Sequence, residues 1–171
     1  MNNNRHIKII RPCAELAASY RAYIEELAEE ERYPFVLDFD FDDFDAFLRR
    51  VAMLEQGVGV PENGEPSSTY WLTVNNEIAG VSNLRHRLNP NLEFAGGHIG
   101  IGIRPVFRGH GLGSLFMNKT LTLARGMGIR PIHVHCYARN HASAAMIRRC
   151  GGKLHSWIET TGQPVLRFLV T

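Results

Sequence analysis

The stretch Gly97–Gly113, GHIGIGIRPVFRGHGLG, decides how the rest of this chain can fold. Its first half alternates as a strand does, with Ile99, Ile101 and Ile103 on one side and glycines among the residues on the other. That glycine face predicts a bulge in the strand, or a ligand lying against its backbone. Pro105 then ends the predicted strand because it has no N–H to donate.

The second half of the stretch is a glycine-rich turn that leads directly into a helical pattern. Glycines allow a tight turn whose backbone N–H groups point at one ligand, and the N-terminus of a helix adds positive potential. The turn therefore predicts a phosphate or pyrophosphate site, with Arg108 or Lys119 as a source of charge. The predicted anion-binding residues are Arg108, Gly109, His110, Gly111, Leu112, Gly113 and Ser114. A glycine turn that binds nothing is the alternative at this level.

Two common nucleotide-binding motifs fit this turn poorly. A nucleoside-triphosphate loop requires Lys-Ser/Thr after its last glycine, whereas Ser114-Leu115 follows here. The dinucleotide fingerprint has its third glycine one position later and an acidic residue about 20 residues further on. The sequence therefore disfavours a GTP- or ATP-binding protein.

Two sequence blocks together resemble the GNAT superfamily of N-acetyltransferases. The run Arg108–Gly113, RGHGLG, is similar to the family's acetyl-CoA-binding motif, R/Q-x-x-G-x-G/A. The run Asn140–Gly152 is similar to the second block, N-x-x-A/S-x-x-L-Y-x-K-x-G-F, except at the positions of its tyrosine and its final phenylalanine. The segments Asn83–His86 and Gly96–His98 also resemble a subgroup of uncharacterised acetyltransferases. Two blocks at this separation are more specific than either alone, although the N-terminal third matches in pattern only.

The resemblance implies a GNAT fold, which is an α+β fold in three layers. Its mixed central sheet has about six or seven strands, splays between the fourth and fifth, and is flanked by about four helices. A single domain over residues 1–171 is expected, because this length suits one hydrophobic core. Strands are predicted at His6–Arg11, Thr69–Val74, Ile78–Leu88, Leu92–Arg104, Ile132–Tyr137, Lys153–Glu159 and Val165–Val170. Helices are predicted after Pro12, from Asp42 onward, at Ser114–Gly126 and at Asn140–Arg149.

Acetyl transfer from a thioester to an amine sets four chemical requirements. The thioester must be held, its developing oxyanion stabilised, the ammonium deprotonated and the thiolate accommodated. The resemblance implies that a bulge frees the backbone of Ile101, Gly102 and Ile103 to bind the pantetheine arm and the carbonyl oxygen. It also implies that Asn140 and Ser143, beside the last helix, contact the cofactor, acetyl-CoA.

The chain departs from the family at the position of the usual acid. Ile147 stands where the family has a tyrosine, and Gly152 replaces its phenylalanine. Isoleucine has no proton to donate, so Tyr137, Ser143 or Cys136 would have to substitute. A thiol with a pKa of about 8.5 can also leave with help from water alone. A non-catalytic module that binds or senses acetyl-CoA is the alternative reading.

Candidates for the base are histidines and one glutamate. Histidine titrates near the working pH. His135 precedes Asn140 by five residues, on the predicted strand where several relatives carry a glutamate base. His98 and Glu93 lie on a neighbouring predicted strand, and a water chain to solvent is the alternative. No metal is expected, because side chains of the run His133–Cys136 point to opposite faces of a strand.

An acidic and aromatic stretch, Phe35–Leu54, bears on the acceptor. From Asp42 it has the period of an amphipathic helix, and its acidic residues either form a solvated face or line an entrance that attracts a cationic amine. The chain is therefore expected to be an acetyl-CoA-dependent N-acetyltransferase. It would act on a primary amine of a small molecule or peptide, by direct attack in a ternary complex.

Composition limits the remaining partners and the location. The net charge of +2 argues neither for nor against nucleic acid, but the absence of aromatic residues among the basic ones of the C-terminal half disfavours it. The sequence has no apolar run long enough to cross a membrane and no apolar signal-peptide core at its start. Three widely spaced cysteines fit a reducing cytoplasm. Homodimers through the C-terminal strands are common among the family, so the resemblance leaves a homodimer and a monomer as alternatives.

Overall fold

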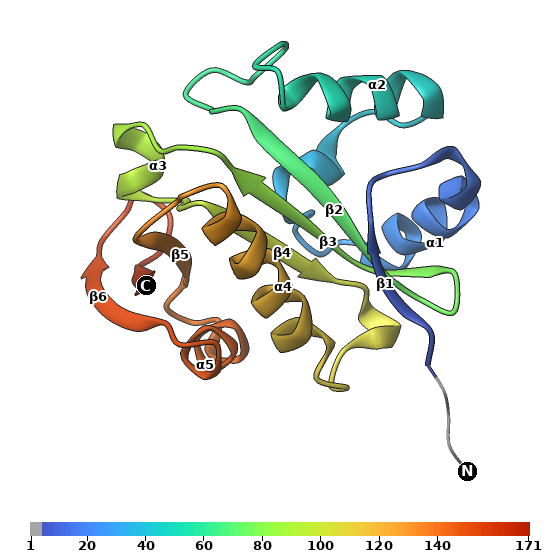
Figure 1. Ribbon diagram of the computed structural model, residues 1–171. Helices are drawn as coiled ribbons and strands as arrows, with labels where there is room; N and C mark the ends of the chain where they lie inside the picture. Colours follow the sequence, from blue (N-terminus) through green and yellow to red (C-terminus); the bar gives the residue numbers. More distant parts are fainter. Residues whose placement is uncertain (1–4) are drawn as a thin grey trace.

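The computed structural model describes residues 5–171 (Figure 1). Its strands are β1 (Ile7–Ile10), β2 (Ser67–Val74), β3 (Glu77–Arg85), β4 (Ile99–Ile103), β5 (Ile132–Tyr137), β6 (Lys153–Ile158) and β7 (Val165–Val170). Its α-helices are α1 (Ala17–Leu27), α2 (Phe44–Leu54), α3 (Pro90–Phe94), α4 (Leu112–Gly126) and α5 (His141–Arg149). Short 3-10 turns are η1 (Ala14–Leu16), η2 (Phe35–Asp38) and η3 (Pro105–Phe107). Among these helices none is long and apolar enough to cross a membrane.

The strands form two antiparallel sheets that meet at one point. The first sheet has the order β1-β2-β3-β4, and the second has the order β5-β7-β6. Strands β4 and β5 approach at an isolated bridge between Gly97 and Val134, where the His98 N–H donates to the His133 carbonyl at 2.8 Å. Beyond the bridge the strands are not paired, so the predicted divergence between the fourth and fifth strands is confirmed.

The first sheet is covered on both faces, which produces two cores. Tyr70 and Leu72 of β2 pack with α4 and the second sheet, whereas Trp71 packs with α1 and α2. Side chains alternate across a strand, so all eight residues of β2 are buried between helices. Figure 1 shows α1 and α2 on the far side of this sheet from α4.

Two of the helices are capped by residues next to them in the chain. The Asp43 carboxylate accepts the Ala46 N–H at 2.9 Å, so it caps the N-terminus of α2. At the other end of the chain, Gly151 has a φ of 90° and follows α5, while the Gly152 N–H donates to the Ile147 carbonyl at 2.9 Å. A left-handed glycine after the last turn is the usual C-terminal cap, and it turns the chain into β6.

The prediction of a strand from Leu92 to Arg104 was wrong in its first half. Residues Pro90–Phe94 form α3 instead, and the Asn89 side chain accepts the Leu92 N–H at 3.0 Å. Asparagine followed by proline is a helix-start signal as well as a turn signal, because proline fits the first helical position. Glu93 therefore lies on a helix and not on a strand beside the sheet gap.

The predicted bulge in β4 was also wrong. Strands β3 and β4 pair in unbroken register from Leu84–Ile99 to Gly80–Ile103, and the register shift lies between β2 and β3. The glycine face of β4 instead accommodates the segment Tyr33–Pro34. A Cβ on Gly100 would lie 3.0 Å from Pro34 Cβ, and one on Gly102 would overlap the Tyr33 carbonyl oxygen. The bare face admits another part of the chain rather than a ligand.

Alanine at these sites tests this packing. We expect Gly102→Ala to lower the free energy of unfolding by about 1–3 kcal/mol, because its methyl group meets backbone atoms of Tyr33. The matched control is Gly126→Ala at the end of α4, where a Cβ meets nothing within 4 Å. That change should raise the free energy of unfolding by up to about 1 kcal/mol. Urea titrations of both variants provide the measurement, and equal effects would contradict the close contact.

Candidate active site

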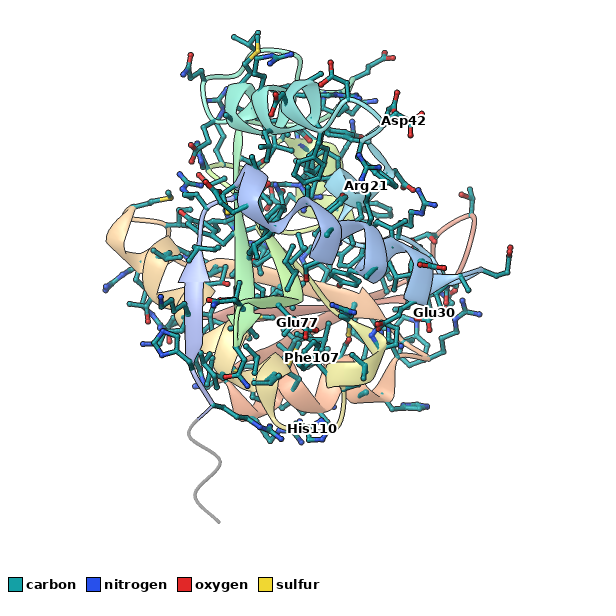
Figure 2. The ribbon with its side chains drawn as sticks, turned by 90° about the vertical axis from the view of Figure 1, so that its right-hand side faces the viewer. Arg21, Glu30, Asp42, Glu77, Phe107 and His110 are labelled. Carbon is teal, nitrogen blue, oxygen red and sulfur yellow. The ribbon has the colours of Figure 1, made fainter. Side chains whose placement is uncertain are left out.

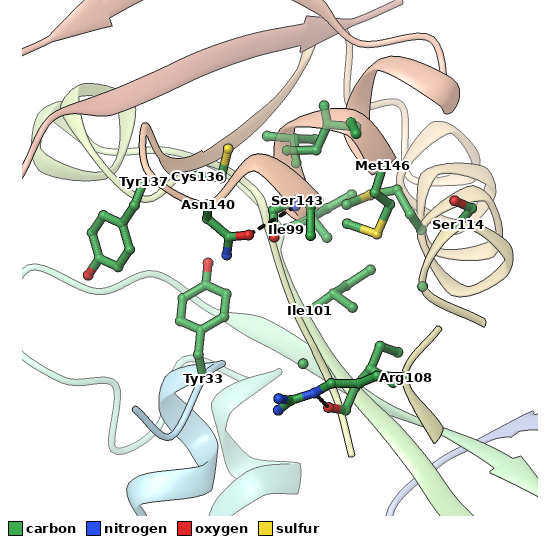
Figure 3. A pocket seen from close by; sticks show the side chains of 18 of the residues that line it. Tyr33, Ile99, Ile101, Arg108, Ser114, Cys136, Tyr137, Asn140, Ser143 and Met146 are labelled. Atoms are coloured by element: carbon green, nitrogen blue, oxygen red, sulfur yellow. Dashed lines mark hydrogen bonds between the residues drawn. The ribbon is translucent and has the colours of Figure 1, made fainter. Parts of the chain in front are cut away.

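A cavity of about 1030 Å³ opens where β4 and β5 diverge (Figure 3). Four parts of the chain line it: the end of α1 with the following loop, β4, the turn into α4, and β5 with α5. These parts are far apart in the sequence, so only the fold brings them together. Most of the predicted site residues lie in one of these four parts.

The glycine turn leaves the first turn of α4 open. Gly109 and Gly111 have φ values of 79° and 76°, and a Cβ on either would meet nothing within 4 Å. The Leu115 N–H is the first to bond within the helix, to the Gly111 carbonyl at 3.2 Å. The N–H groups at the start of α4 have no partner within a helix, which is the basis of anion binding at helix N-termini.

The structure brings most of the predicted anion-binding residues to the cavity wall. Those on the wall are Arg108, Gly109, Gly111, Leu112, Gly113 and Ser114. His110 is exposed and lies outside the cavity, at the outer end of the turn in Figure 2. The prediction for His110 as a cofactor residue therefore has no support from its position.

Arg108 has partners within the protein. Its Nε donates to the Ile103 carbonyl at 2.9 Å, and its two terminal nitrogens contact the Glu30 carboxylate at 3.1 and 2.8 Å. The hydrogen bonds from Arg108 lower the pKa of Glu30. Arg108 therefore connects the glycine turn to the end of α1 and shares its charge with Glu30. Lys119 does not line the cavity, whereas Arg149 of α5 does.

The free edge of β4 supplies backbone donors without a bulge. At the two ends of the strand, His98 and Arg104 are hydrogen-bonded to the backbone of β3. Backbone groups alternate in direction along an antiparallel strand, so Ile101 and Ile103 direct theirs into the gap. The bond from Arg108 to the Ile103 carbonyl lies on this side. Of the three predicted backbone residues, Gly102 alone is turned toward β3.

The residues of the second block lie across the gap from β4. The Asn140 side chain accepts the Ser143 N–H at 3.0 Å and caps α5, and both residues line the cavity (Figure 3). The two departures from the family pattern also belong together. A Cβ on Gly152 would overlap Cγ2 of Ile147 and would lie 2.9 Å from the Ile147 carbonyl oxygen, so both the side chain and the backbone at 147 favour glycine at 152.

The predicted bases are not arranged to accept a proton. His135 lines the cavity, but its Nδ1 accepts the Gly96 N–H at 3.1 Å. Burial lowers the pKa of His135 to about 3, so the ring is neutral with its proton on Nε2, a donor. His98 accepts the His133 N–H, burial lowers its pKa to about 4, and it does not line this cavity. Glu93 on α3 does not line it either.

Three tyrosines, Tyr23, Tyr33 and Tyr137, and the thiol of Cys136 line the cavity. The Tyr137 hydroxyl donates to the Glu31 carboxylate at 3.3 Å. Burial raises the pKa of Cys136 to about 11, so this thiol is protonated near neutral pH. Tyr33 was missed by sequence reasoning, since a lone tyrosine before a proline carries no functional signal. The glycine face of β4 is the one feature of the sequence that implies a neighbour there.

The acidic wall of the cavity differs from the predicted one. Asp42, which the sequence placed at an acidic entrance, does not line the cavity and lies near Arg21 in Figure 2. Glu30 and Glu31 line it instead. Glu30 is paired with Arg108, whereas no ion pair to Glu31 is found within residues 5–171. A carboxylate without a neutralising partner thus stands at the end of the cavity opposite α4.

The described part of the chain shows no cluster of side chains that could bind a metal ion. No group of three or more His, Cys, Asp and Glu side chains in residues 5–171 is placed to hold a metal ion. Of the arginines that gather between residues 125 and 149, only one lines the cavity, Arg149; the others are Arg125, Arg130, Arg139 and Arg148.

Comparison with known protein families shows to which family this chain belongs. Residues 21–152 match the model of the acetyltransferase (GNAT) family, which covers more than half of the chain. The chain belongs to the GNAT family of acetyltransferases. The family match spans both sequence blocks, and it confirms the α+β GNAT fold and the assignment as an acetyltransferase. No curated protein matches the sequence at a significant level.

Solved structures share the GNAT fold at low sequence identity. RimL, a ribosomal-protein alpha-N-acetyltransferase in complex with coenzyme A, has a TM-score of 0.72 and 18% identity, over 95% of this chain and 92% of its own. An acetyltransferase from Salmonella typhimurium, which modifies the N-terminal serine of a ribosomal protein, has a TM-score of 0.70 and 18% identity, over 95% and 93%. MccE, a microcin self-immunity acetyltransferase with acetyl-CoA and AMP, has a TM-score of 0.70 and 16% identity, over 95% and 91%.

Proposed function

We propose that this GNAT enzyme transfers the acetyl group of acetyl-CoA to a primary amine by direct attack in a ternary complex. The observation that supports this most is the cavity itself. It joins the open first turn of α4 to the free edge of β4 and ends at an unneutralised carboxylate, Glu31. An anion, an extended thioester and a cation would find suitable partners along this one path.

The cofactor would lie along the path in a defined direction. Its pyrophosphate would bind the N–H groups at the start of α4, and Arg149 would add positive charge. Its pantetheine arm would run along β4, whose Ile101 and Ile103 direct backbone groups into the gap. Asn140 and Ser143 would line the opposite side. Solved relatives hold coenzyme A or acetyl-CoA, which supports this assignment.

The acetyl group would pass directly from acetyl-CoA to the acceptor, without an acetyl-enzyme intermediate. The amine nitrogen attacks the carbonyl carbon, and the Ile101 N–H stabilises the oxygen that becomes negative. The C–S bond then breaks, and its electron pair leaves with the sulfur. A Cys136 acetyl intermediate is disfavoured, because the raised pKa of Cys136 leaves little thiolate near neutral pH.

The acceptor is proposed to be a cationic small molecule or peptide amine. Glu31 offers a carboxylate to an ammonium, and the Tyr137 hydroxyl, which contacts Glu31, lies in the same wall. Relatives of this fold act on both kinds of acceptor: one modifies an N-terminal serine, and another is a spermidine N-acetyltransferase. Deprotonation of the ammonium would proceed through water, since neither His135 nor His98 is arranged to accept its proton.

A panel of amines with acetyl-CoA tests the proposal. Purified protein would be assayed for release of free thiol and for the mass of the acetylated product, with polyamines, amino acid amides and peptides as acceptors. Acceptor-dependent thiol release supports an enzyme. Binding of acetyl-CoA without turnover of any acceptor would favour the sensing module instead.

Neutralising Glu31 is expected to weaken acceptor binding. Glu31→Gln removes a charge-assisted contact and should raise the KM of a cationic acceptor by about tenfold, with little change in the Kd for acetyl-CoA. Glu29→Gln and Asp42→Asn are matched controls, since both residues are exposed acids that do not line the cavity. Steady-state kinetics decide the outcome, and an equal effect of all three changes would refute a specific role for Glu31.

Two further proposals concern the cellular location and the oligomeric state of the enzyme. Cys13, Cys136 and Cys150 are all free thiols, which supports our assignment to the cytoplasm. The outer strand β6 exposes Leu154 and Trp157, and we propose it as the surface of a homodimer. Sedimentation of the purified protein measures the oligomeric state directly.

A further inference from the structure

We propose that Tyr33 donates the proton that the departing coenzyme A sulfur takes up. Ile147, at the position of the family's usual tyrosine, has no group that could supply this proton. The inference rests on the acetyl-transfer function proposed above. It assigns a catalytic role to a residue of the loop between α1 and η2, whereas the family motif places its tyrosine on the helix that is α5 here.

The first observation is that the glycine face of β4 holds Tyr33 in the gap. The ring carbon Cζ and the hydroxyl of Tyr33 each lie 3.1 Å from the point where a Cβ on Gly100 would be. The Tyr33 carbonyl oxygen occupies the corresponding place at Gly102. Both the backbone and the ring of Tyr33 therefore depend on glycines of β4, and the phenol is fixed against the strand proposed to hold the thioester.

The second observation is the direction of the phenol. Tyr33 lines the cavity, and 37% of the residue is exposed although Pro34 behind it is buried. Figure 3 shows the ring rising from the loop after α1, with its hydroxyl toward Asn140. The hydroxyl thus lies between β4 and the start of α5, at the level of Gly100. The thioester would pass through this same gap.

The other proton-bearing groups of the cavity are less suited to the role. The Tyr137 hydroxyl already donates to Glu31, and the Tyr23 hydroxyl is fully buried, without access to a ligand. The Nε2 atom of His135 is buried as well. The Ser143 hydroxyl is a far weaker acid than a phenol.

The environment keeps Tyr33 protonated at neutral pH. Partial burial raises the pKa of Tyr33, Arg85 of β3 lowers it by a smaller amount, and the still weaker effects of Glu31 and Cys136 raise it. Tyr23 and Tyr137 are the other phenols on the cavity wall. A phenol with a pKa above its usual value of about 10 is protonated before the reaction and can donate to a sulfur as its C–S bond lengthens.

Each proton that moves in this step has a donor and an acceptor within the site. After the neutral amine attacks, the tetrahedral intermediate carries a negative oxygen and a positively charged nitrogen. The C–S bond breaks, its electron pair passes to the sulfur, and the Tyr33 proton forms the S–H bond of coenzyme A. The phenolate then takes one proton from the acetylated nitrogen, which yields the neutral amide and restores Tyr33.

Two changes at Tyr33 test the step. Tyr33→Phe should lower kcat with acetyl-CoA by about 100-fold, within the usual range for general acid catalysis. The loss should shrink below about tenfold with the acetyl thioester of an aromatic thiol, because that thiolate leaves without a proton. A fluorinated tyrosine incorporated at position 33 keeps the shape of the ring but makes the phenol more acidic. It should move the alkaline fall of the kcat profile to lower pH.

The outcomes separate this inference from the function on which it rests. Tyr137→Phe is the control phenol, and it should raise the acceptor KM while leaving the dependence on the leaving thiol as in the wild type. If fluorination leaves the pH profile in place, or if Tyr33→Phe loses equally with both thioesters, Tyr33 is not the acid. If the wild-type enzyme acetylates no amine at all, the proposed function fails, and so does the inference built upon it.

Discussion

Replacing Gly111 by glutamate is expected to raise the Kd for acetyl-CoA by about 100-fold or more. Gly111 immediately precedes α4 and has a φ of 76°. A carboxylate at this point would neutralise the positive potential of the helix N-terminus and would repel the pyrophosphate. A 100-fold rise in Kd corresponds to about 2.8 kcal/mol, to which each of these two effects would contribute about 1.4 kcal/mol.

The control for this change is Gly128→Glu at the other end of α4. Gly128 has a φ of 78°, and neither glycine would place a Cβ within 4 Å of another atom. Both variants therefore carry the same backbone strain, which is about 1–2 kcal/mol for a residue with a side chain in this conformation. Gly128 does not line the cavity, so its variant should bind acetyl-CoA as the wild type does.

Calorimetric titration of acetyl-CoA into the three proteins gives the answer. Binding to the wild type and Gly128→Glu, lost in Gly111→Glu, would place the pyrophosphate at the start of α4. Loss in both variants would indicate a general effect of strain. No binding to the wild type would refute the enzyme and the sensing module together.

Replacing Glu26 by alanine is expected to lower the free energy of unfolding by about 3 kcal/mol. Arg104 follows β4, its side chain is 8% exposed, and its main ionic contact is with the Glu26 carboxylate at 2.6 Å. Its other acidic neighbour, Glu77, is more distant at 3.6 Å and largely exposed. Without Glu26 the guanidinium is buried with only a weak ionic partner, and an uncompensated buried charge is costly.

The pH dependence of this loss has a defined sign. The hydrogen bond from Arg104 lowers the pKa of Glu26 below its ordinary value of 4.5. A lowered carboxylate pKa stabilises the fold above the ordinary value, and the effect disappears as the pH falls through the lowered one. The difference between wild type and Glu26→Ala should therefore be full at pH 7 and should shrink as the pH falls below about 4.

The control for Glu26 is the exposed pair between Glu30 and Arg108. Its contact of 2.8 Å is similar, but both side chains are about half exposed. Glu30→Gln should therefore cost at most about 1 kcal/mol of stability, because surface ion pairs are solvated in either state. Urea unfolding of both variants at several pH values measures the contrast. If both variants lost the same free energy of unfolding, the burial of Arg104 would not add to the cost of removing its ionic partner.

The sequence alone determined the family and the local geometry of the proposed cofactor end. The glycine turn, the helix after it and the second block lie within short stretches, and their signals depend on residues a few positions apart. The caps at Asp43 and Gly151 could be predicted for the same reason, since a cap is made by neighbours in the chain. The start of α3 was misread because Asn89-Pro90 fits a turn and a helix equally well.

Only the tertiary structure showed which residues form the proposed acceptor end and the proposed proton-transfer groups. Glu31 and Tyr33 enter the cavity because the loop after α1 packs on β4, about 70 residues further along the chain. His135 ceased to be a candidate base because the Gly96 N–H, from another segment, fixes its tautomer. Such roles depend on contacts between distant residues, and no periodicity or motif in a single sequence records them. The glycine face of β4 showed that something must lie against the strand, and only the fold showed that it is Tyr33.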